Sequence, residues 1–158
     1  MSPRAAWRLE TLGFTEVYDY VAGKKDWGSF GLPRGGRKAE VPSAGAVARA
    51  DVPTCALDER LPDVRARIGD WATCIVVNDS RVVLGRLGRS ALRRADDIAA
   101  EDAMTEGPRT RRPSIGFDAL LVWMDERKLT SALITTPDGR LVGVVLREDL
   151  ERIRDEAV

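Results

Sequence analysis

The sequence predicts a mixed α/β (α+β) chain in which two βαββα repeats, packed with pseudo-twofold symmetry, follow a short N-terminal helix-strand segment. From about residue 49 onward, short apolar runs alternate with charged segments of helical periodicity, which is typical of strands alternating with helices. The second half also aligns with the first, because Thr54 falls on Thr110 and Leu92 on Leu150, at spacings of 56 and 58 residues. Self-similarity at a fixed period indicates a repeated structural unit.

Each repeat predicts a strand, a helix, a strand, a turn, a strand and a closing helix. In the second repeat, Ser114 is the expected N-cap of the first helix. The inward face of that helix is expected to carry four apolar residues at helical spacing, Phe117, Leu120, Leu121 and Met124. The stretches "SALITT" and "RLVGVVL" are strands joined by a "PDG" turn, and "REDLERIRDE" is the closing helix. One such unit buries too little surface alone, so the two copies are expected to pack together.

The predicted boundaries follow changes in composition along the chain. The stretch "RGGRKAEVPSAGAVA" is rich in glycine, alanine, proline and charge and has no apolar period, so it is expected to be a linker. The acidic stretch "ADDIAAEDAMTEG" is expected to be a connecting helix. The predicted segments are an N-terminal segment (1–33), a linker (34–48), the first repeat (49–94), the connecting helix (95–107) and the second repeat (108–158).

The composition excludes several classes of function. Twenty-five basic and 25 acidic residues cancel, so no nucleic-acid or membrane partner is expected. No apolar run approaches the roughly 20 residues that span a bilayer, which predicts a cytoplasmic protein. The chain has no histidine, which removes Ser-His-Asp catalysis and most zinc sites. Its two cysteines, Cys55 and Cys74, lie in apolar contexts and are expected to be buried, reduced thiols.

The repeat order and the phrases "AMTEGPRTRRPS" and "DGRLVGVVLREDL" resemble a tandem pair of cystathionine-beta-synthase (CBS) domains, the Bateman module, over about residues 50–155. The resemblance implies a non-catalytic regulatory module that binds an adenosine-containing ligand such as AMP, ATP or S-adenosylmethionine. It also implies a homodimer formed through the CBS helices. No cofactor or metal is expected to be required.

The ligand signature of the CBS family is a glycine in the last strand, a Thr or Ser three residues on, and an Asp three further. Gly143 and Asp149 match this signature, but Leu146 stands at the hydroxyl position. In the first repeat Ala91 replaces the Asp, so a single site centred on Asp149 is expected. A carboxylate can accept hydrogen bonds from both ribose hydroxyls, at about 1.5–3 kcal/mol each.

The remaining candidate ligand-binding residues are assigned by the same resemblance. Thr110 and Arg111 lie in the strand that begins the second repeat, and Leu129 and Ser131 lie near the start of its second strand. The two other candidates are arginines that could receive phosphates, Arg147 and Arg89. An arginine-rich loop is also common as a solvated face, and a helix dipole alone favours an acidic residue at the position of Asp149. The alternative function is therefore a ligand-free structural or partner-binding CBS pair with a decayed pocket.

Residues 1–33 resemble the last part of a rhodanese-like domain, with the helix "RAAWRLETLGF", the strand "EVYDYV", and then Gly23, Trp27 and "GLP". The sulfur-carrying cysteine of that family would lie before the equivalent of Ser2. A sulfurtransferase remnant is thus a remote alternative, and no such activity is expected without the thiol. Either the polypeptide begins further upstream, or the fragment docks on the repeats through its apolar side chains, Trp7, Leu12, Phe14 and Val17.

Overall fold

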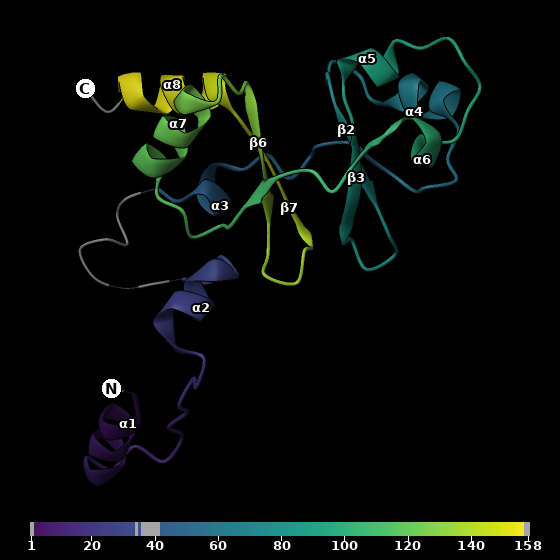
Figure 1. The fold of residues 1–158 in the computed structure, drawn as a ribbon. Helices are drawn as coiled ribbons and strands as arrows, with labels where there is room; N and C mark the ends of the chain where they lie inside the picture. The colour runs from purple at the N-terminus through teal and green to yellow at the C-terminus, as the bar shows by residue number, and fades with distance from the viewer. Residues whose placement is uncertain (1, 34, 36–41, 157–158) are drawn as a thin grey trace.

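The computed structural model describes residues 2–33, 35 and 42–156 of the chain. Two small sheets, each covered by short helices, form two lobes that lie side by side (Figure 1). The helices are α1 (Ser2–Thr11), α2 (Gly23–Ser29), α3 (Ala44–Val47), α4 (Leu61–Arg67), α5 (Arg89–Leu92), α6 (Ala100–Ala103), α7 (Phe117–Glu126) and α8 (Arg147–Glu156). The strands are β1 (Thr54–Cys55), β2 (Cys74–Val77), β3 (Val83–Leu87), β4 (Thr105–Glu106), β5 (Thr110–Arg111), β6 (Ser131–Thr135) and β7 (Leu141–Leu146).

Both repeats have the predicted order of strand, helix, strand, strand and helix. The first sheet has the order β1-β2-β3-β4 and the second the order β5-β6-β7. In each sheet the first strand lies parallel to the second, and the second and third form an antiparallel hairpin. The mixed α/β class and the two-repeat architecture are therefore confirmed.

Helix α7 has the predicted apolar face but a different start. Ser114 is not its N-cap, because residues 113–114 form a turn in which the Ile115 N–H donates to the Arg112 carbonyl (3.1 Å). The helix begins after Gly116, whose carbonyl accepts the first helical hydrogen bond from Leu120 (3.0 Å). The buried side chains of α7 are Phe117, Leu120, Trp123 and Met124, while Leu121 packs at the edge of the same core.

The end of the predicted linker is part of the folded repeats, so that prediction is wrong for residues 42–48; residues 34 and 36–41 lie outside the described residues. Helix α3 packs on the second repeat, where Ala44 is fully buried in the core. Small residues are needed there, since a Cβ on Gly45 would lie 2.8 Å from Pro113 Cβ. The glycine and alanine content that suggested a linker allows this close approach.

The connecting segment 95–107 is mostly not helical. It contains the four-residue helix α6 and then β4, which pairs with β3 at the edge of the first sheet. Ala100 is buried in the first repeat's core, and Ile98 and Met104 pack against that core. Helices α3 and α6 are equivalent at a spacing of 56 residues, and each precedes one repeat while packing on the last strand of the other. The two repeats are thereby interlocked.

A third apolar cluster joins the sheets. Ile75 from β2 and Leu133 from β6 are both buried in it, together with Val144 from β7. Burying side chains of this size contributes roughly 1.5–3 kcal/mol each. The two repeats therefore pack as one unit, and any cavity between them is bounded by residues that this cluster positions.

Helix α1, the predicted helix of the N-terminal segment, stands apart from the repeats (Figure 1). Residues 16–21 do not form the predicted strand "EVYDYV", and neither sheet of the described residues includes them; a strand needs a partner edge to pair with its backbone. The alternative in which the apolar face docks on the repeats is not observed for Trp7, Leu12 and Phe14, which are 65%, 59% and 60% exposed, whereas Val17 is half-buried. Contact with the second repeat comes after α2, where a Cβ on Gly31 would lie 3.3 Å from Pro113 Cβ.

Candidate functional site

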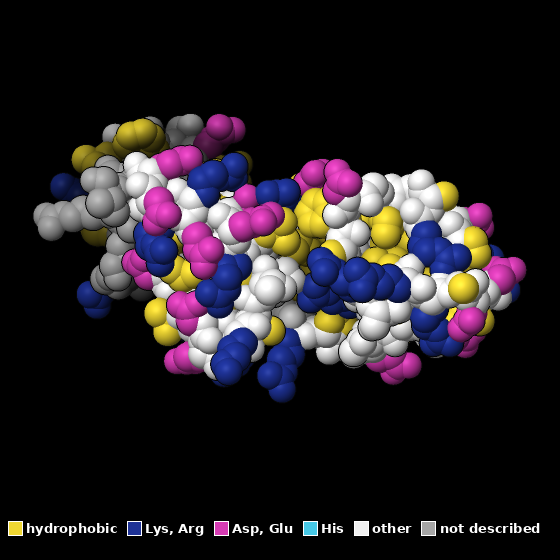
Figure 2. All heavy atoms as spheres, turned by 90° about the horizontal axis from the view of Figure 1, so that it is seen from above, with side chains coloured by type: hydrophobic (Ala, Val, Ile, Leu, Met, Phe, Trp, Pro, Cys, Tyr) yellow, Lys and Arg dark blue, Asp and Glu magenta, His cyan; other side chains and the backbone are white. Residues whose placement is uncertain are grey.

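A cavity of about 880 Å³ lies between the two repeats. Four segments line it together with Arg49, two from the first repeat (within 70–73 and 86–89) and two from the second (130–131 and within 146–151). Figure 2 looks onto the end of the molecule that carries α5 and α8, and shows dark blue Lys and Arg atoms where the lobes meet. The cavity lies where strands β3 and β7 run into helices α5 and α8.

The lining segments are equivalent in the two repeats. At a spacing of 58 residues, Thr73 corresponds to Ser131 and Arg89 to Arg147, and all four line the cavity. Both residues are buried, since Ser131 begins β6 and Thr73 directly precedes β2. The cavity therefore lies across the pseudo-twofold axis and is formed by both repeats.

Arg86 links the two repeats across this axis. Its Nε donates to Thr73 Oγ1 (2.9 Å) and its Nη2 donates to Ser131 Oγ (2.8 Å). Burial lowers the pKa of this guanidinium. No carboxylate pairs with Arg86 in the described part of the chain. The equivalent position in the second repeat is Val144, so a single cation occupies this place.

Asp149 is held in an ion pair. Arg49 Nε donates to Asp149 Oδ2 (2.6 Å) and Arg49 Nη2 to Oδ1 (2.7 Å), while Arg152 Nη2 also donates to Oδ1 (2.9 Å). The carboxylate is 8% exposed, and its hydrogen bonds with Arg49 lower its pKa. Arg49, Glu148 and Glu151 line the cavity, but Asp149 itself does not.

The ion pair is present in one half of the pseudo-symmetric structure. The position equivalent to Arg49 is Thr105, at a spacing of 56 residues, and the position equivalent to Asp149 is Ala91, at 58. Arg49 and Asp149 thus form an ion pair at one of the two equivalent places, and Thr105 and Ala91 replace both residues at the other. The carboxylate at position 149 accordingly has a structural partner that the closing helix alone does not reveal.

Two more predicted residues, Arg147 and Arg89, line the cavity in addition to Ser131. Arg147 Nε donates to the Leu129 carbonyl (3.0 Å), and its guanidinium pairs with Asp125 and with Glu151. The hydrogen bond and ion pair with Asp125 raise the pKa of Arg147. Arg89 is exposed at the first position of α5, and its guanidinium has no ion-pair partner among the residues that the structure describes.

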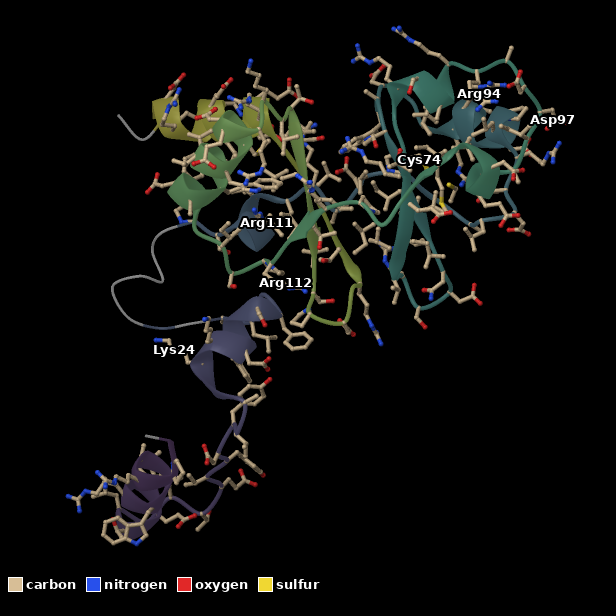
Figure 3. The ribbon with its side chains drawn as sticks, in the orientation of Figure 1. Lys24, Cys74, Arg94, Asp97, Arg111 and Arg112 are labelled. Carbon is tan, nitrogen blue, oxygen red and sulfur yellow. The ribbon has the colours of Figure 1, made fainter. Side chains whose placement is uncertain are left out.

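The other predicted residues, Thr110, Arg111 and Leu129, lie elsewhere. Thr110 pairs with Leu133 in the second sheet, and Leu129 packs at the edge of the second repeat's core. The Arg111 guanidinium lies 4.1 Å from the centre of the Trp123 ring, within the second lobe (Figure 3). The structure does not bring these three side chains to the cavity.

Sequence reasoning missed Arg49 and Trp71. Trp71 lies two residues before Thr73 on the cavity wall, and the Arg49 guanidinium lies 5.9 Å from the centre of its ring. Trp71 is equivalent to Leu129 at the 58-residue spacing, so the repeat alignment contained a signal for it. Arg49 had no such signal, because its role depends on the crossing of α3 to the other repeat.

Two interlocked βαββα repeats around a shared cleft define the fold of a CBS domain pair. The solved structure of CBSX2 in complex with AMP is similar, with 16% identity over 73% of this chain and 97% of that chain (TM-score 0.65). The CBS domain pair of MJ0100, in complex with 5-methylthioadenosine and S-adenosylmethionine, shows 14% identity over 75% and 99% (TM-score 0.63). The cytosolic domain of the Mg²⁺ channel MgtE in complex with ATP shows 17% identity over 73% of this chain (TM-score 0.62).

These similarities establish the fold. The chain spans about half the length of the magnesium-transport structures that it matches, with 49% and 50% of those chains covered. No family model and no curated protein sequence matches the chain. Over the described residues, none of the helices has the length and apolar content needed to cross a membrane, and no group of three or more Cys, Asp or Glu residues is placed to hold a metal ion.

Proposed function

We propose that this chain is a non-catalytic regulatory module that binds an adenosine-containing ligand, such as AMP, ATP or S-adenosylmethionine, in the cavity between its two repeats. The observation that carries the proposal is the cavity itself, whose volume of about 880 Å³ lies in the range typical of small-molecule sites. Structures of the same fold in complex with AMP, ATP and S-adenosylmethionine support the class of ligand.

The cavity wall offers contacts suited to a purine nucleoside. Trp71 and Leu146 provide apolar surface, and an aromatic ring such as that of Trp71 can stack on a base. Ser131 and Thr130 provide hydroxyl and backbone groups on the same cavity wall. Because both repeats form the wall, a ligand that binds one relative orientation of the repeats more tightly would shift the population toward that orientation.

A single site centred on Asp149 is a narrower form of this proposal. It requires the ribose hydroxyls to replace Arg49 as hydrogen-bond partners of the Asp149 carboxylate. The exchange would keep the nearly buried carboxylate paired, and the Arg49 side chain, which is 39% exposed, has room to turn toward ligand phosphates. In this form Asp149→Asn weakens adenosine binding, whereas in the broader form the substitution lowers stability and leaves affinity unchanged.

The test is a thermal-shift panel with AMP, ADP, ATP, S-adenosylmethionine and NAD, followed by calorimetric titration. A ligand at 100 times its dissociation constant stabilises by about 2.7 kcal/mol. For a chain of this length, that corresponds to roughly 5–11 °C in the unfolding midpoint. We expect Trp71→Ala to abolish the shift and Arg94→Ala, at an exposed ion pair with Asp96, to preserve it.

The second candidate function is a structural or partner-binding CBS pair without a ligand. It is favoured by Leu146 and Ala91 at two positions of the family's ligand signature, and by the engagement of Asp149 with Arg49. If no nucleotide shifts the midpoint at millimolar concentration, this candidate replaces the first. The expected homodimer is part of both candidates, and light scattering after size-exclusion chromatography measures it directly.

A further inference from the structure

We infer that the cavity selects its ligand by a phosphate group, which binds at Arg86 beside Ser131, so that phosphorylated adenosine compounds are preferred over adenosine and S-adenosylmethionine. The inference rests on the proposed function and specifies the charge of the ligand. It is carried by the hydrogen-bonding capacity that Arg86 and its neighbours leave unused at the cavity wall.

Arg86 is a partly buried cation without a compensating anion. Its two hydrogen-bond acceptors, Thr73 and Ser131, are neutral hydroxyls. A guanidinium has five N–H donors in a planar fork that matches phosphate geometry, and Arg86 Nη1 has no protein acceptor among the described residues. Removing a charge from water without pairing it is costly, so an anion in the cavity would offset that cost.

The hydroxyls beside Arg86 differ in what they have left to donate. Thr73 Oγ1 donates its proton to the Leu87 carbonyl (3.0 Å), so this group is satisfied. Ser131 Oγ accepts from Arg86, and within the described part of the chain its own proton has no acceptor. Ser131 and Arg86 therefore both present donors to the cavity. A phosphate, which offers only acceptors at neutral pH, complements such a set.

The other charges on the wall are mostly paired. Arg49 is neutralised by Asp149, and Arg147 by Asp125 and Glu151, whereas Arg89 adds a second cation without an ion pair among the described residues. Asp70 and Glu148 also line the cavity, Glu148 at 3.8 Å from Arg49, and their negative charges should oppose a phosphate bound next to them. The uncompensated cations Arg86 and Arg89 both come from the end of β3 and the start of α5, so this side of the cavity is the expected phosphate position.

The position of Arg86 also explains how such a ligand could be sensed. Arg86 is bonded to one hydroxyl from each repeat, and its equivalent, Val144, is a buried core residue. One phosphate bound to this guanidinium would therefore contact a group that holds both repeats. S-adenosylmethionine carries a sulfonium and an ammonium against a single carboxylate, so its net positive charge should disfavour it beside these cations relative to a phosphate.

The test is calorimetric titration of the full chain with AMP, ATP, adenosine, S-adenosylmethionine and inorganic pyrophosphate. We expect AMP to bind roughly 10- to 100-fold more tightly than adenosine, the factor associated with charge-assisted hydrogen bonds. Arg86→Gln should reduce the ratio of AMP affinity to adenosine affinity to about one. Arg89 is exposed, so Arg89→Gln should leave the fold unchanged and weaken ATP binding by a smaller factor, and Arg94→Gln is the matched control.

The outcomes separate the inference from the proposed function. If adenosine or S-adenosylmethionine binds as tightly as AMP, or if Arg86→Gln leaves the ratio of AMP to adenosine affinity unchanged, the inference is overturned and the adenosine proposal stands. If pyrophosphate binds in an Arg86-dependent manner while no adenosine compound binds, the phosphate site stands and the adenosine proposal fails. If none of the five compounds binds, both are overturned.

Discussion

The ion pair between Arg49 and Asp149 should stabilise the fold, and its two members should respond unequally to substitution. The Asp149 side chain is 8% exposed, whereas that of Arg49 is 39% exposed. Asp149→Asn leaves a guanidinium that can turn into solvent. Arg49→Met leaves a nearly buried carboxylate whose remaining partner, Arg152, is itself 65% exposed. The second substitution should therefore be the more destabilising.

The magnitudes follow from burial. Breaking a fully buried pair by removing one partner costs about 3–5 kcal/mol, and exposed pairs contribute about 0–1 kcal/mol. Because Arg49 is more than one-third exposed, we expect about 1–2 kcal/mol for Asp149→Asn and about 2–3 kcal/mol for Arg49→Met. At roughly 2–4 °C per kcal/mol for a chain of this size, the two variants should differ by a few degrees in midpoint.

The assay is urea unfolding of the wild type, the two single variants and the double variant. The double-mutant cycle should give a coupling energy of about 1–2 kcal/mol, because the two side chains share two hydrogen bonds. The exposed Arg94 and Asp96 pair is the control and should give less than about 0.5 kcal/mol. A coupling energy no larger than that of the control, or equal effects of the two single substitutions, would refute the reasoning.

Three further predictions follow from the same geometry. Arg49 lowers the pKa of Asp149 in the folded state. The stability that this carboxylate contributes is therefore complete above its unfolded pKa of about 4 and is lost as the pH falls through the folded pKa. In urea unfolding at pH 7, 5 and 3, the difference in stability between wild type and Asp149→Asn should shrink only at the lowest pH. Gly143→Ala should lower the free energy of unfolding by about 1–3 kcal/mol, since its Cβ would lie 2.5 Å from the Arg49 carbonyl oxygen. Gly88→Ala, with open space around the new Cβ, should lower it by about 0.5 kcal/mol. Equal unfolding midpoints for the two variants would contradict this prediction. Replacing the exposed Trp7 by Ser should move the midpoint by less than about 1 °C, and a loss of several degrees would mean that α1 docks on the repeats after all.

The sequence predicted the strands, the helices after them and their duplication, because apolar periodicity and repeat spacing are local signals. It did not predict α3, because four residues of alanine, glycine and valine have no measurable apolar period and owe their position to the other repeat. The strand expected at residues 16–21 is absent although its local pattern does favour a strand. Its alternation is suitable for a strand, but a strand also requires a partner edge, and in the part of the chain that the structure describes neither sheet extends to these residues.

The candidate site shows the same division between local and distant causes. Ser131, Arg147 and Arg89 lie at ends of predicted elements, and the fold brings them to one cavity. The partner of Asp149, by contrast, is 100 residues away in sequence and reaches it only because α3 crosses to the other repeat. A pattern read along one helix could identify the carboxylate but could not identify what the carboxylate binds.

The glycines of the proposed ligand signature have a packing explanation that changes where the ligand should be sought. Gly143 lies against the Arg49 backbone and Gly85 against the Met104 side chain, so each gives room to the segment that crosses from the other repeat. A glycine in the last strand is therefore required by the interlocked fold whether or not a ligand binds. With the glycines explained by packing and Asp149 engaged by Arg49, the cations without an ion pair among the described lining residues are Arg86 and Arg89, and a ligand anion should be sought beside them rather than beside Asp70.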